Sequence, residues 1–214
     1  MIEPLVVIGA GGFGRETLGV VDAINDAGSQ PRFELLGVLD DDPSELNMSR
    51  LAALGVRHLG TIAEWLEADA RALFAVGVGS PTTRDSIARR FEERGHRAAT
   101  LIDPRAHIGR ASSAGSGSVV CAGVEISTNV TLGRHVHVNP HVTIGHDTLV
   151  GDCVSINPAA TVSGDVTIED RVLIGAAAVI LQGLTVGAGS LVGAAACVVR
   201  DVPTSATVKG VPAR

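Results

Sequence analysis

The chain has 214 residues, and its 17 Lys and Arg against 23 Asp and Glu give a formal net charge of −6, which argues against nucleic acid or an anionic membrane as its main partner. Hydrophobic residues make up 45% and charged residues 19%, as in a globular protein and unlike a disordered chain. With 26 glycines and only 2% aromatic residues, the core must be filled by small and branched aliphatic side chains, which favours a regular, tightly wound β architecture.

The first 100 residues predict an α/β unit. Residues 5–8 are a short apolar run that suits a buried parallel strand, and the glycine-rich segment Gly9–Gly14 follows it before a helical pattern begins. Strand, glycine turn, helix and strand in this order begin a doubly wound, Rossmann-like sheet. We expect strands over 5–8, 33–39 and 73–78, and helices over 15–24, 61–68 and from 81 through 91.

The segment Gly9–Gly14 fits the pattern GxGxxG, and Asp40 ends the next predicted strand. Such a turn can bind phosphates at the N-terminus of the helix, with the carboxylate on a ribose. A nucleotide sugar, a dinucleotide such as NAD, and a tight turn that binds nothing are all compatible with the glycines alone. A unit of about 100 residues is short for a six-stranded dinucleotide fold, so we favour the nucleotide sugar.

The second half of the chain repeats every six residues. Every sixth residue from Ile102 to Val198 is Ile, Val or Leu, with Ala114 as the exception. A helix needs a period of about 3.6 and a hairpin sheet strict alternation, whereas this period suits a triangular coil with three hexads in each turn. Gly often follows the aliphatic residue, and we expect it to supply backbone freedom at the bends. The alternative to an enzyme here is a solenoid without chemistry, such as a scaffold or antifreeze protein.

Four of the seven histidines lie between residues 135 and 146. His146 and Asp147 come two and three positions after the inward Ile144, so both are expected to point out of the prism, with Gly164 one turn along leaving open backbone beside the imidazole. An outward imidazole next to a carboxylate can act as a general base, and the alternative is a solvated surface histidine. The other three histidines are His135, His137 and His141. Each could be catalytic, solvated or a metal ligand at a subunit axis, and we expect His135 and His141 to point outward as well.

The sequence favours direct group transfer over a covalent acyl-enzyme. It contains no Ser-His-Asp nucleophile elbow, and Cys153 is not framed as a nucleophile. The N–H of Gly164 could face a developing oxyanion. In the tail, Lys209 and Arg214 could meet phosphates, and the alternative is a solvated C-terminal tail. The three cysteines form no CxxC pair or His/Cys cluster, so neither a disulfide framework nor a metal is predicted.

These residues resemble a known family. The hexads, the block Ile144–Asp147 and the closing segment Lys209–Arg214 resemble hexapeptide-repeat acyltransferases that use acyl-CoA, and Gly9–Arg15 with Leu39–Asp41 narrows the resemblance to sugar acyltransferases. That family is typified by sialic acid O-acetyltransferase and bacterial UDP-4-amino-sugar N-acetyltransferases. The resemblance covers nearly the whole chain, and it implies a left-handed β-helix, acetyl-CoA as co-substrate, and a homotrimer with active sites between neighbouring subunits.

The resemblance also implies roles for single residues. His146 matches the family's base, Asp147 the acidic neighbour that raises its basicity, and Gly164 a backbone contact to acetyl-CoA. Asn139 matches a polar residue that lines the acceptor pocket. The residues that match the loops holding the nucleotide part are Gly11, Gly12, Asp40, Asp41 and Gly79.

Two positions depart from the family's pattern. Phe13 stands in the loop facing the acceptor where the family commonly has His, which removes a polar contact and points to a changed acceptor. Ser155 stands near the acyl carrier where the family again commonly has His. A serine can still donate a hydrogen bond to the cofactor, but it cannot carry a proton at neutral pH.

Together these features predict a cytoplasmic, acetyl-CoA-dependent acetyltransferase that acts on an amine or hydroxyl of a nucleotide-activated sugar. The expected organisation is a Rossmann-like nucleotide-sugar-binding domain over residues 1–100, a left-handed β-helix acyltransferase domain over 101–203 and a C-terminal tail over 204–214. Two alternatives stay open: a nucleotide-sugar-binding module or scaffold without turnover, and an acyltransferase for another small acceptor. The apolar stretch 172–199 is long enough to span a membrane, but its glycines and its six-residue repeat argue against that.

Overall fold

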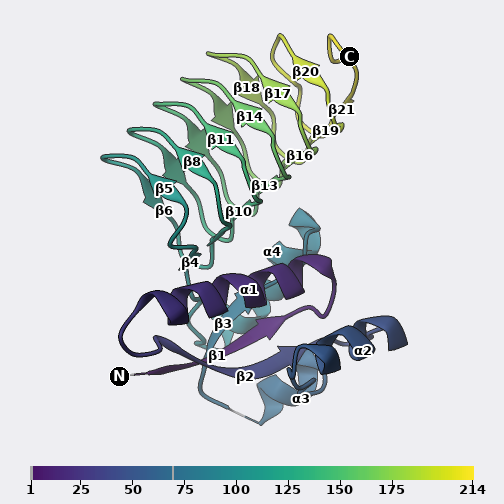
Figure 1. The fold of residues 1–214 in the computed structure, drawn as a ribbon. Coiled ribbons are helices and arrows are strands. Elements are labelled where there is room, and N and C mark those ends of the chain that lie inside the picture. Colours follow the sequence, from purple (N-terminus) through teal and green to yellow (C-terminus); the bar gives the residue numbers. More distant parts are fainter. Residues whose placement is uncertain (1, 69) are drawn as a thin grey trace.

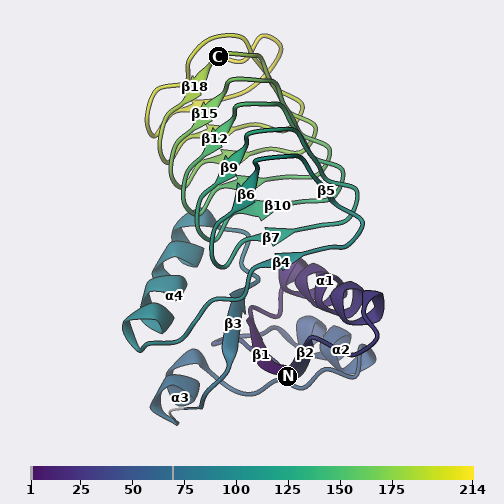
Figure 2. The ribbon, with the colours of Figure 1, turned by 90° about the vertical axis from the view of Figure 1, so that its left-hand side faces the viewer.

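The computed structural model describes residues 2–68 and 70–214. An α/β unit carries the N-terminus, and a parallel β-helix rises from it to a C-terminus at the far end (Figure 1). The same stacking of one unit on the other is visible after a quarter turn (Figure 2). No helix in the described parts of the chain is long and apolar enough to cross a membrane.

The α/β unit is built on a three-stranded parallel sheet in the order β2-β1-β3. The apolar run 5–8 forms most of the central strand. Its four side chains are buried because helices pack on both faces of the sheet. The strands are β1 (Glu3–Ile8), β2 (Phe33–Leu39) and β3 (Leu73–Val76). The helices are α1 (Gly12–Ala27), α2 (Glu45–Ala53), α3 (Ile62–Glu67) and α4 (Pro81–Glu93).

These elements confirm the predicted α/β order and add one helix to it. The short helix α2 was not predicted, although Ser44 caps its first turn by accepting from the Asn47 N–H. The helix α3 begins with a capping box between Thr61 and Glu64, and α4 begins with the Ser80 cap followed by Pro81. The third strand ends at Val76, earlier than predicted. The Gly77 N–H still donates to the Ile8 carbonyl at 2.7 Å, and Gly77 packs against Gly14.

The β-helix has three parallel sheets, one for each side of the prism. Sheet 1 contains β4 (Leu101–Ile102), β7 (Val119–Val120), β10 (His137–Val138), β13 (Ser155–Ile156), β16 (Leu173–Ile174), β19 (Leu191–Val192) and β21 (Thr207–Val208). Sheet 2 contains β5 (His107–Ile108), β8 (Glu125–Ile126), β11 (Thr143–Ile144), β14 (Thr161–Val162), β17 (Val179–Ile180) and β20 (Cys197–Val198). Sheet 3 contains β6 (Ser113–Ala114), β9 (Thr131–Leu132), β12 (Leu149–Val150), β15 (Thr167–Ile168) and β18 (Thr185–Val186).

The predicted six-residue repeat and the left-handed β-helix are confirmed. Each hexad contributes one two-residue strand, and its second residue is the aliphatic that points inward. Ile144 pairs in parallel with Val162 one turn later, and both are at most 1% exposed. Burial of each such branched side chain stabilises the fold by about 1.5–3 kcal/mol relative to exposure. The small residues between the strands, such as Ala160, complete the same core.

The glycines after the aliphatic residues have a different role from the predicted one. Gly145 and Gly175 do not have a positive φ, but a Cβ on either would lie 2.5 Å from a backbone nitrogen of the next turn. Close approach of successive turns, not freedom at a bend, therefore requires glycine there. The left-handed conformation falls two positions further along the hexad, mostly on other residue types, as at Asp147 (φ 60°) and Ala177 (φ 55°).

The β-helix also extends past the predicted boundary at residue 203. β21 pairs with β19 on sheet 1, with Thr207 opposite Leu191, so the last turn is shorter than the others. The Ala213 N–H then donates to the Cys197 carbonyl at 2.7 Å, and Ala213 is 4% exposed against the core. The backbone of the tail therefore forms a cap on the prism, while the side chains of Lys209 and Arg214 remain exposed.

Candidate functional site

The clearest catalytic geometry lies at the corner that follows β11. His146 Nδ1 is 2.7 Å from Asp147 Oδ2, and the two side chains are 61% and 49% exposed. A carboxylate oxygen can only accept in this pair, so the proton of the neutral ring lies on Nδ1 and the lone pair on Nε2. The outward direction predicted for both residues is thus what the structure has.

Asn129 holds the carboxylate from the preceding turn. Its Nδ2 donates to Asp147 Oδ1 at 2.7 Å, so the two oxygens of Asp147 have separate partners. The hydrogen bonds from Asn129 first, and then from His146, lower the pKa of Asp147 below its usual value. Asp147 therefore stays ionised and fixes the tautomer of the imidazole.

Gly164 lies directly against the free side of this imidazole. A Cβ on Gly164 would be 2.6 Å from His146 Nε2, so any larger residue would block the nitrogen. The Gly164 carbonyl accepts from the Gly183 N–H at 3.1 Å, whereas its own N–H makes no backbone hydrogen bond within the described residues. An imidazole nitrogen and open backbone thus adjoin each other, as predicted.

The glycine turn of the α/β unit contains two kinds of glycine. Gly9 has φ 108°, and a Cβ on Gly14 would collide with the Gly9 carbonyl oxygen, so the fold itself requires both. A Cβ on Gly11, Gly12 or Gly79 would meet nothing within 4 Å. Gly11 and Gly79 lie in the loops after β1 and β3, and Gly12 is the first residue of α1. All three are at the carboxyl ends of the strands, where ligands of open α/β sheets bind. Steric fit within this chain does not require glycine there, which suits close approach of a ligand.

Asp40 and Asp41 shape the neighbouring loops. Asp40 accepts from the Ala10 N–H at 2.7 Å and from the Asp42 N–H at 3.1 Å. Asp41 Oδ1 accepts from the Ile62 N–H at 2.7 Å, at the start of α3. Each carboxylate retains further acceptor capacity, so a contact to a ribose hydroxyl stays compatible with this geometry.

Phe13 and His137 form a stack between the two units. Their ring centroids are 4.1 Å apart, and His137 Nε2 is 2.8 Å from the Val76 carbonyl at the end of β3. Arg84 Nη1 lies 3.1 Å from Nδ1, so the ring is neutral with its proton on Nε2. Burial, and then the charge of Arg84, hold the pKa of His137 well below its ordinary value. This histidine positions loops and has no lone pair left for catalysis.

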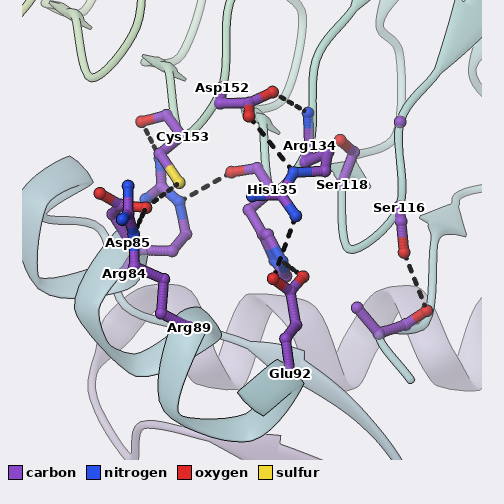
Figure 3. A network of polar contacts seen from close by, with 12 residues as sticks. Arg84, Asp85, Arg89, Glu92, Ser116, Ser118, Arg134, His135, Asp152 and Cys153 are labelled. Atoms are coloured by element: carbon purple, nitrogen blue, oxygen red, sulfur yellow. Dashed lines mark hydrogen bonds and ion pairs between the residues drawn. The ribbon is translucent and has the colours of Figure 1, made fainter. Parts of the chain in front are cut away.

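His135 is likewise covered by the α/β unit. It points out of the prism as predicted, but it is 0% exposed, because α4 lies over it (Figure 3). Its Nε2 is 3.0 Å from Glu92 Oε1, while Nδ1 has no partner among the residues that the structure describes and lies against Gly117. Burial lowers the pKa of this ring. Arg134 extends the network by bonding both Glu92 and Asp152.

Ser155 and Asn139 lie on sheet 1, where the α/β unit docks. Ser155 is 2% exposed, and its Oγ accepts from Arg84 and donates to the Gly79 carbonyl at 2.9 Å each. The structure therefore places Ser155 beside the loop of Gly79 rather than on an open surface. Asn139 is 7% exposed and donates from Nδ2 to the Ile156 carbonyl at 3.0 Å.

Lys209 and Arg214 lie at the opposite end of the β-helix from the α/β unit. Both side chains are exposed, and their backbones pair through two hydrogen bonds that close the final turn. The predicted site residues thus fall into three groups: the acid–base corner, the loops that meet sheet 1, and the cationic cap. In one chain the structure brings residues together within each group, and the three groups lie on different parts of the surface.

Two important residues were missed by the sequence reasoning. Asn129 could have been found, because it precedes Asp147 by one turn of the repeat. Arg84 gave no periodic or motif signal, since its partners are distant in sequence.

One cavity of about 540 Å³ lies apart from these places. It opens at the amino end of the sheet between Glu3, Arg32 and Ser116, away from the glycine loops. Among residues 2–68 and 70–214, no group of three or more His, Cys, Asp or Glu could hold a metal ion.

Known proteins share both units. Residues 4–91 match the family described as the PglD N-terminal domain. PerB from Caulobacter crescentus, in complex with CoA and GDP-perosamine, is 28% identical with a TM-score of 0.86, over 100% of this chain and 97% of that one. The acetyltransferase domain of PglB from Neisseria gonorrhoeae FA1090, in complex with acetyl coenzyme A, is 30% identical with a TM-score of 0.83, over 100% and 99%.

A third solved structure agrees with these two. WeeI from Acinetobacter baumannii AYE is 28% identical with a TM-score of 0.84, over 98% of both chains. No curated protein matches the sequence.

Proposed function

Because the chain belongs to the hexapeptide-repeat sugar acyltransferases, we propose that it transfers the acetyl group of acetyl-CoA to an amine or hydroxyl of a nucleotide-activated sugar. The complex of PerB with CoA and GDP-perosamine supports this substrate class. The observation that carries the proposal is the contact of 2.7 Å between His146 Nδ1 and Asp147 Oδ2, with Gly164 beside the free Nε2.

In the proposed reaction His146 is the general base. Nε2 takes a proton from the acceptor as its nitrogen or oxygen attacks the thioester carbonyl. The tetrahedral oxyanion accepts a hydrogen bond from the Gly164 N–H, and the C–S bond then breaks. The departing thiolate takes the proton from His146, and Asp147 stabilises the imidazolium between these steps. No acyl-enzyme forms, so both substrates must be bound together.

The two substrates approach from different parts of the molecule. Acetyl-CoA follows the corner from Gly164 toward the cap, where Lys209 and Arg214 meet its phosphates. The backbones of Gly11, Gly12 and Gly79 hold the nucleotide, with Asp40 and Asp41 beside its ribose. Since both hydrogen-bonding functions of Ser155 are used within the chain, we leave it out of the cofactor site.

The acceptor part of the sugar lies beyond these loops, next to Phe13 and Asn139. One face of the Phe13 ring is stacked on the neutral His137, and the other face is the one that would meet the acceptor. This side of the acceptor pocket is therefore apolar, in contrast to the histidine that the family commonly has there.

The active enzyme is a homotrimer in this proposal, with each site shared between subunits. Within one chain the nucleotide loops adjoin sheet 1, whereas His146 follows sheet 2 on another side of the prism. A neighbouring prism would bring one subunit's loops to the other's imidazole. The free thiols Cys121, Cys153 and Cys197 suit the reducing cytoplasm, where we place the enzyme.

The test is the substitution His146→Ala, measured with acetyl-CoA and a panel of UDP-, GDP- and dTDP-amino sugars. Loss of a general base should lower kcat by about 10²–10⁴-fold, with CoA affinity retained. The matched control is His141→Ala. His141 is also an exposed corner histidine, but in the described parts of the chain it pairs with no carboxylate, so kcat should stay near that of wild type. Near wild-type transfer by a folded His146→Ala variant would refute the role.

The alternative function, a nucleotide-sugar-binding module or scaffold without turnover, is tested with the wild-type protein. Calorimetric titration of the wild type with CoA should show binding, since the proposal places CoA along the corner and the cap. Absence of CoA binding, together with binding of a nucleotide sugar, would favour a binding module or scaffold.

A further inference from the structure

One buried arginine joins the α/β unit to the β-helix. Arg84, on α4, is 0% exposed, and no ion pair to it occurs among the described residues. All of its hydrogen-bond acceptors are neutral, at distances between 2.8 and 3.2 Å. They are the carbonyl oxygens of Val78, Gly79, His135 and Cys153, Nδ1 of His137 and Oγ of Ser155.

These acceptors come from two places that matter for the proposed reaction. Val78 and Gly79 belong to the loop after β3, which would hold the nucleotide. The other acceptors belong to a single turn of the β-helix: two lie where β10 begins and two where β13 begins. That turn carries His146 at its middle corner (Figure 3 shows its two ends beside Arg84). One guanidinium therefore fixes the loop against both ends of the turn that carries the base.

The same guanidinium reaches the second nucleotide loop through one intermediate. Its Nη1 lies 3.1 Å from His137 Nδ1, and the opposite nitrogen of that ring is bonded to Val76. The ring is thereby fixed on both sides, and Phe13 stacks on its face at 4.1 Å. The position of the segment Gly11–Phe13, where the loop after β1 leads into α1, thus depends on the arginine as well.

Stability alone does not explain this arrangement. Removing a guanidinium from water costs several kcal/mol, and well-packed apolar residues of similar volume often serve a fold as well or better than buried ions. A planar fork of five donors, by contrast, fixes the relative position of several backbone segments, which an apolar side chain or a lysine cannot do.

We propose that Arg84 is a positioning residue for nucleotide-sugar binding: it holds the loops at Gly11–Phe13 and Gly79 in register with the turn that carries His146. This inference rests on the proposed function. It assigns Arg84 no contact with either substrate, and it makes Ser155 and His137 parts of the same positioning device.

The experiment compares Arg84→Lys and Arg84→Met with the wild type. For both variants we expect the KM for the nucleotide sugar to rise by about tenfold or more, and the KM for acetyl-CoA to stay within about twofold. The control is Arg89→Met on the same helix. Its side chain is 62% exposed, and its one ion pair among the described residues is with Asp85, so both KM values should be unchanged. If the Arg84 variants fold and keep both KM values, with only the melting temperature lowered, the inference is overturned.

A milder substitution covers the case in which the Arg84 variants do not fold. Ser155→Ala removes one acceptor of the guanidinium and one hydrogen bond to Gly79, and it should raise the KM for the nucleotide sugar by about threefold. A change confined to the KM for acetyl-CoA, or no change in either KM, would overturn the inference; the former would return Ser155 to the cofactor site.

Direct binding separates this inference from the proposed function. UDP, GDP and dTDP are titrated into the wild type and the same variants without acetyl-CoA. A wild type that binds nucleotide but transfers no acetyl group refutes the proposed function, while weaker nucleotide binding in the Arg84 or Ser155 variants still supports the positioning role. A wild type that binds none of the three nucleotides contradicts both.

Discussion

His146 has a free Nε2 because its other nitrogen is held by Asp147, which is held in turn by Asn129. A lone exposed imidazole would rotate and share its proton between both nitrogens. Two turns of the β-helix prevent this by placing the amide directly behind the carboxylate. The unit of function at this scale is therefore a set of three side chains, with Gly164 as the open backbone against which they face.

The glycines at the nucleotide loop give a prediction at the same scale. Gly12→Ala should leave the free energy of unfolding within about 0.5 kcal/mol of wild type, since a Cβ there meets nothing, and it should raise the KM for the nucleotide sugar by about tenfold. Gly14→Ala should destabilise by more than about 3 kcal/mol, because its Cβ would strike Gly9. Urea unfolding and steady-state kinetics check both; equal destabilisation by the two substitutions would contradict the distinction.

At the scale of the element, one hexad combines three different backbone requirements. The strand residue points inward, the next residue must let the following turn approach, and the corner residue adopts a left-handed conformation. Glycine meets the second requirement in eight of the 17 hexads. It is used less often for the third, where Asn, Asp, His and Ala also occur. The strict repeat therefore arises from contacts between turns as well as from the core.

One turn of the β-helix allows these requirements to be tested separately. Gly175→Ala should destabilise the protein by about 1–3 kcal/mol, because the new methyl group would lie 2.5 Å from the Ala194 nitrogen. Ala177→Gly should stabilise it by roughly 0.5–1 kcal/mol, since Ala177 has φ 55° and an exposed side chain. Chemical denaturation measures both, and a stabilising Gly175→Ala would show that bend flexibility is the reason for the glycine after all.

For the whole molecule, the contact between the two units buries polar groups that are elsewhere solvated. Arg84, His135 and His137 are all at most 1% exposed, and both histidines are neutral. The α/β unit is therefore fixed in a defined orientation on the prism. Its loops and α4 are held by directed hydrogen bonds to particular turns, which is what the proposed reaction requires of them.

This contact predicts a loss of stability on acidification. Burial lowers the pKa values of both His135 and His137 in the folded protein. Below about pH 6.5 the unfolded chain therefore binds protons at these two residues that the folded chain does not bind. The free energy of unfolding should then fall by up to about 1.4 kcal/mol per pH unit for each of the two, until the folded values are reached. Above pH 6.5 neither contributes.

The check is urea unfolding of wild type and His137→Gln between pH 5 and 8 (a range about the unperturbed histidine value). The variant should show a slope smaller by about one proton below pH 6.5. Parallel curves for the two proteins would rule out His137 as a source of the acid sensitivity.

The proposed trimer gives a second prediction at this scale. His146→Ala and Gly79→Trp should each be inactive alone, the first for lack of a base and the second because a bulky side chain fills the nucleotide loop. If sites are shared between subunits, mixed trimers from co-expression should regain part of the wild-type activity, since some sites then combine an intact loop with an intact base. Mixed trimers as inactive as the parents would contradict shared sites.

The sequence by itself determined the β-helix and its chemistry-bearing corner. A period of six fixes which side chains point inward, and hence that His146 and Asp147 point out with Gly164 beside them. The order of strand, glycine turn and helix likewise predicted the α/β unit. Local apolar patterns determine the strands and helices, and backbone sterics determine the turn.

The tertiary structure alone decided what covers the outside of the prism. Periodicity places His135, His137 and Ser155 on its surface but carries no information about docking of a non-periodic unit, and Arg84 shows its partners only when distant segments meet. Inward positions are set by contacts between turns that the repeat itself encodes. Outward positions gain their surroundings from long-range packing, and so the same residue type is solvated at one corner and buried at another.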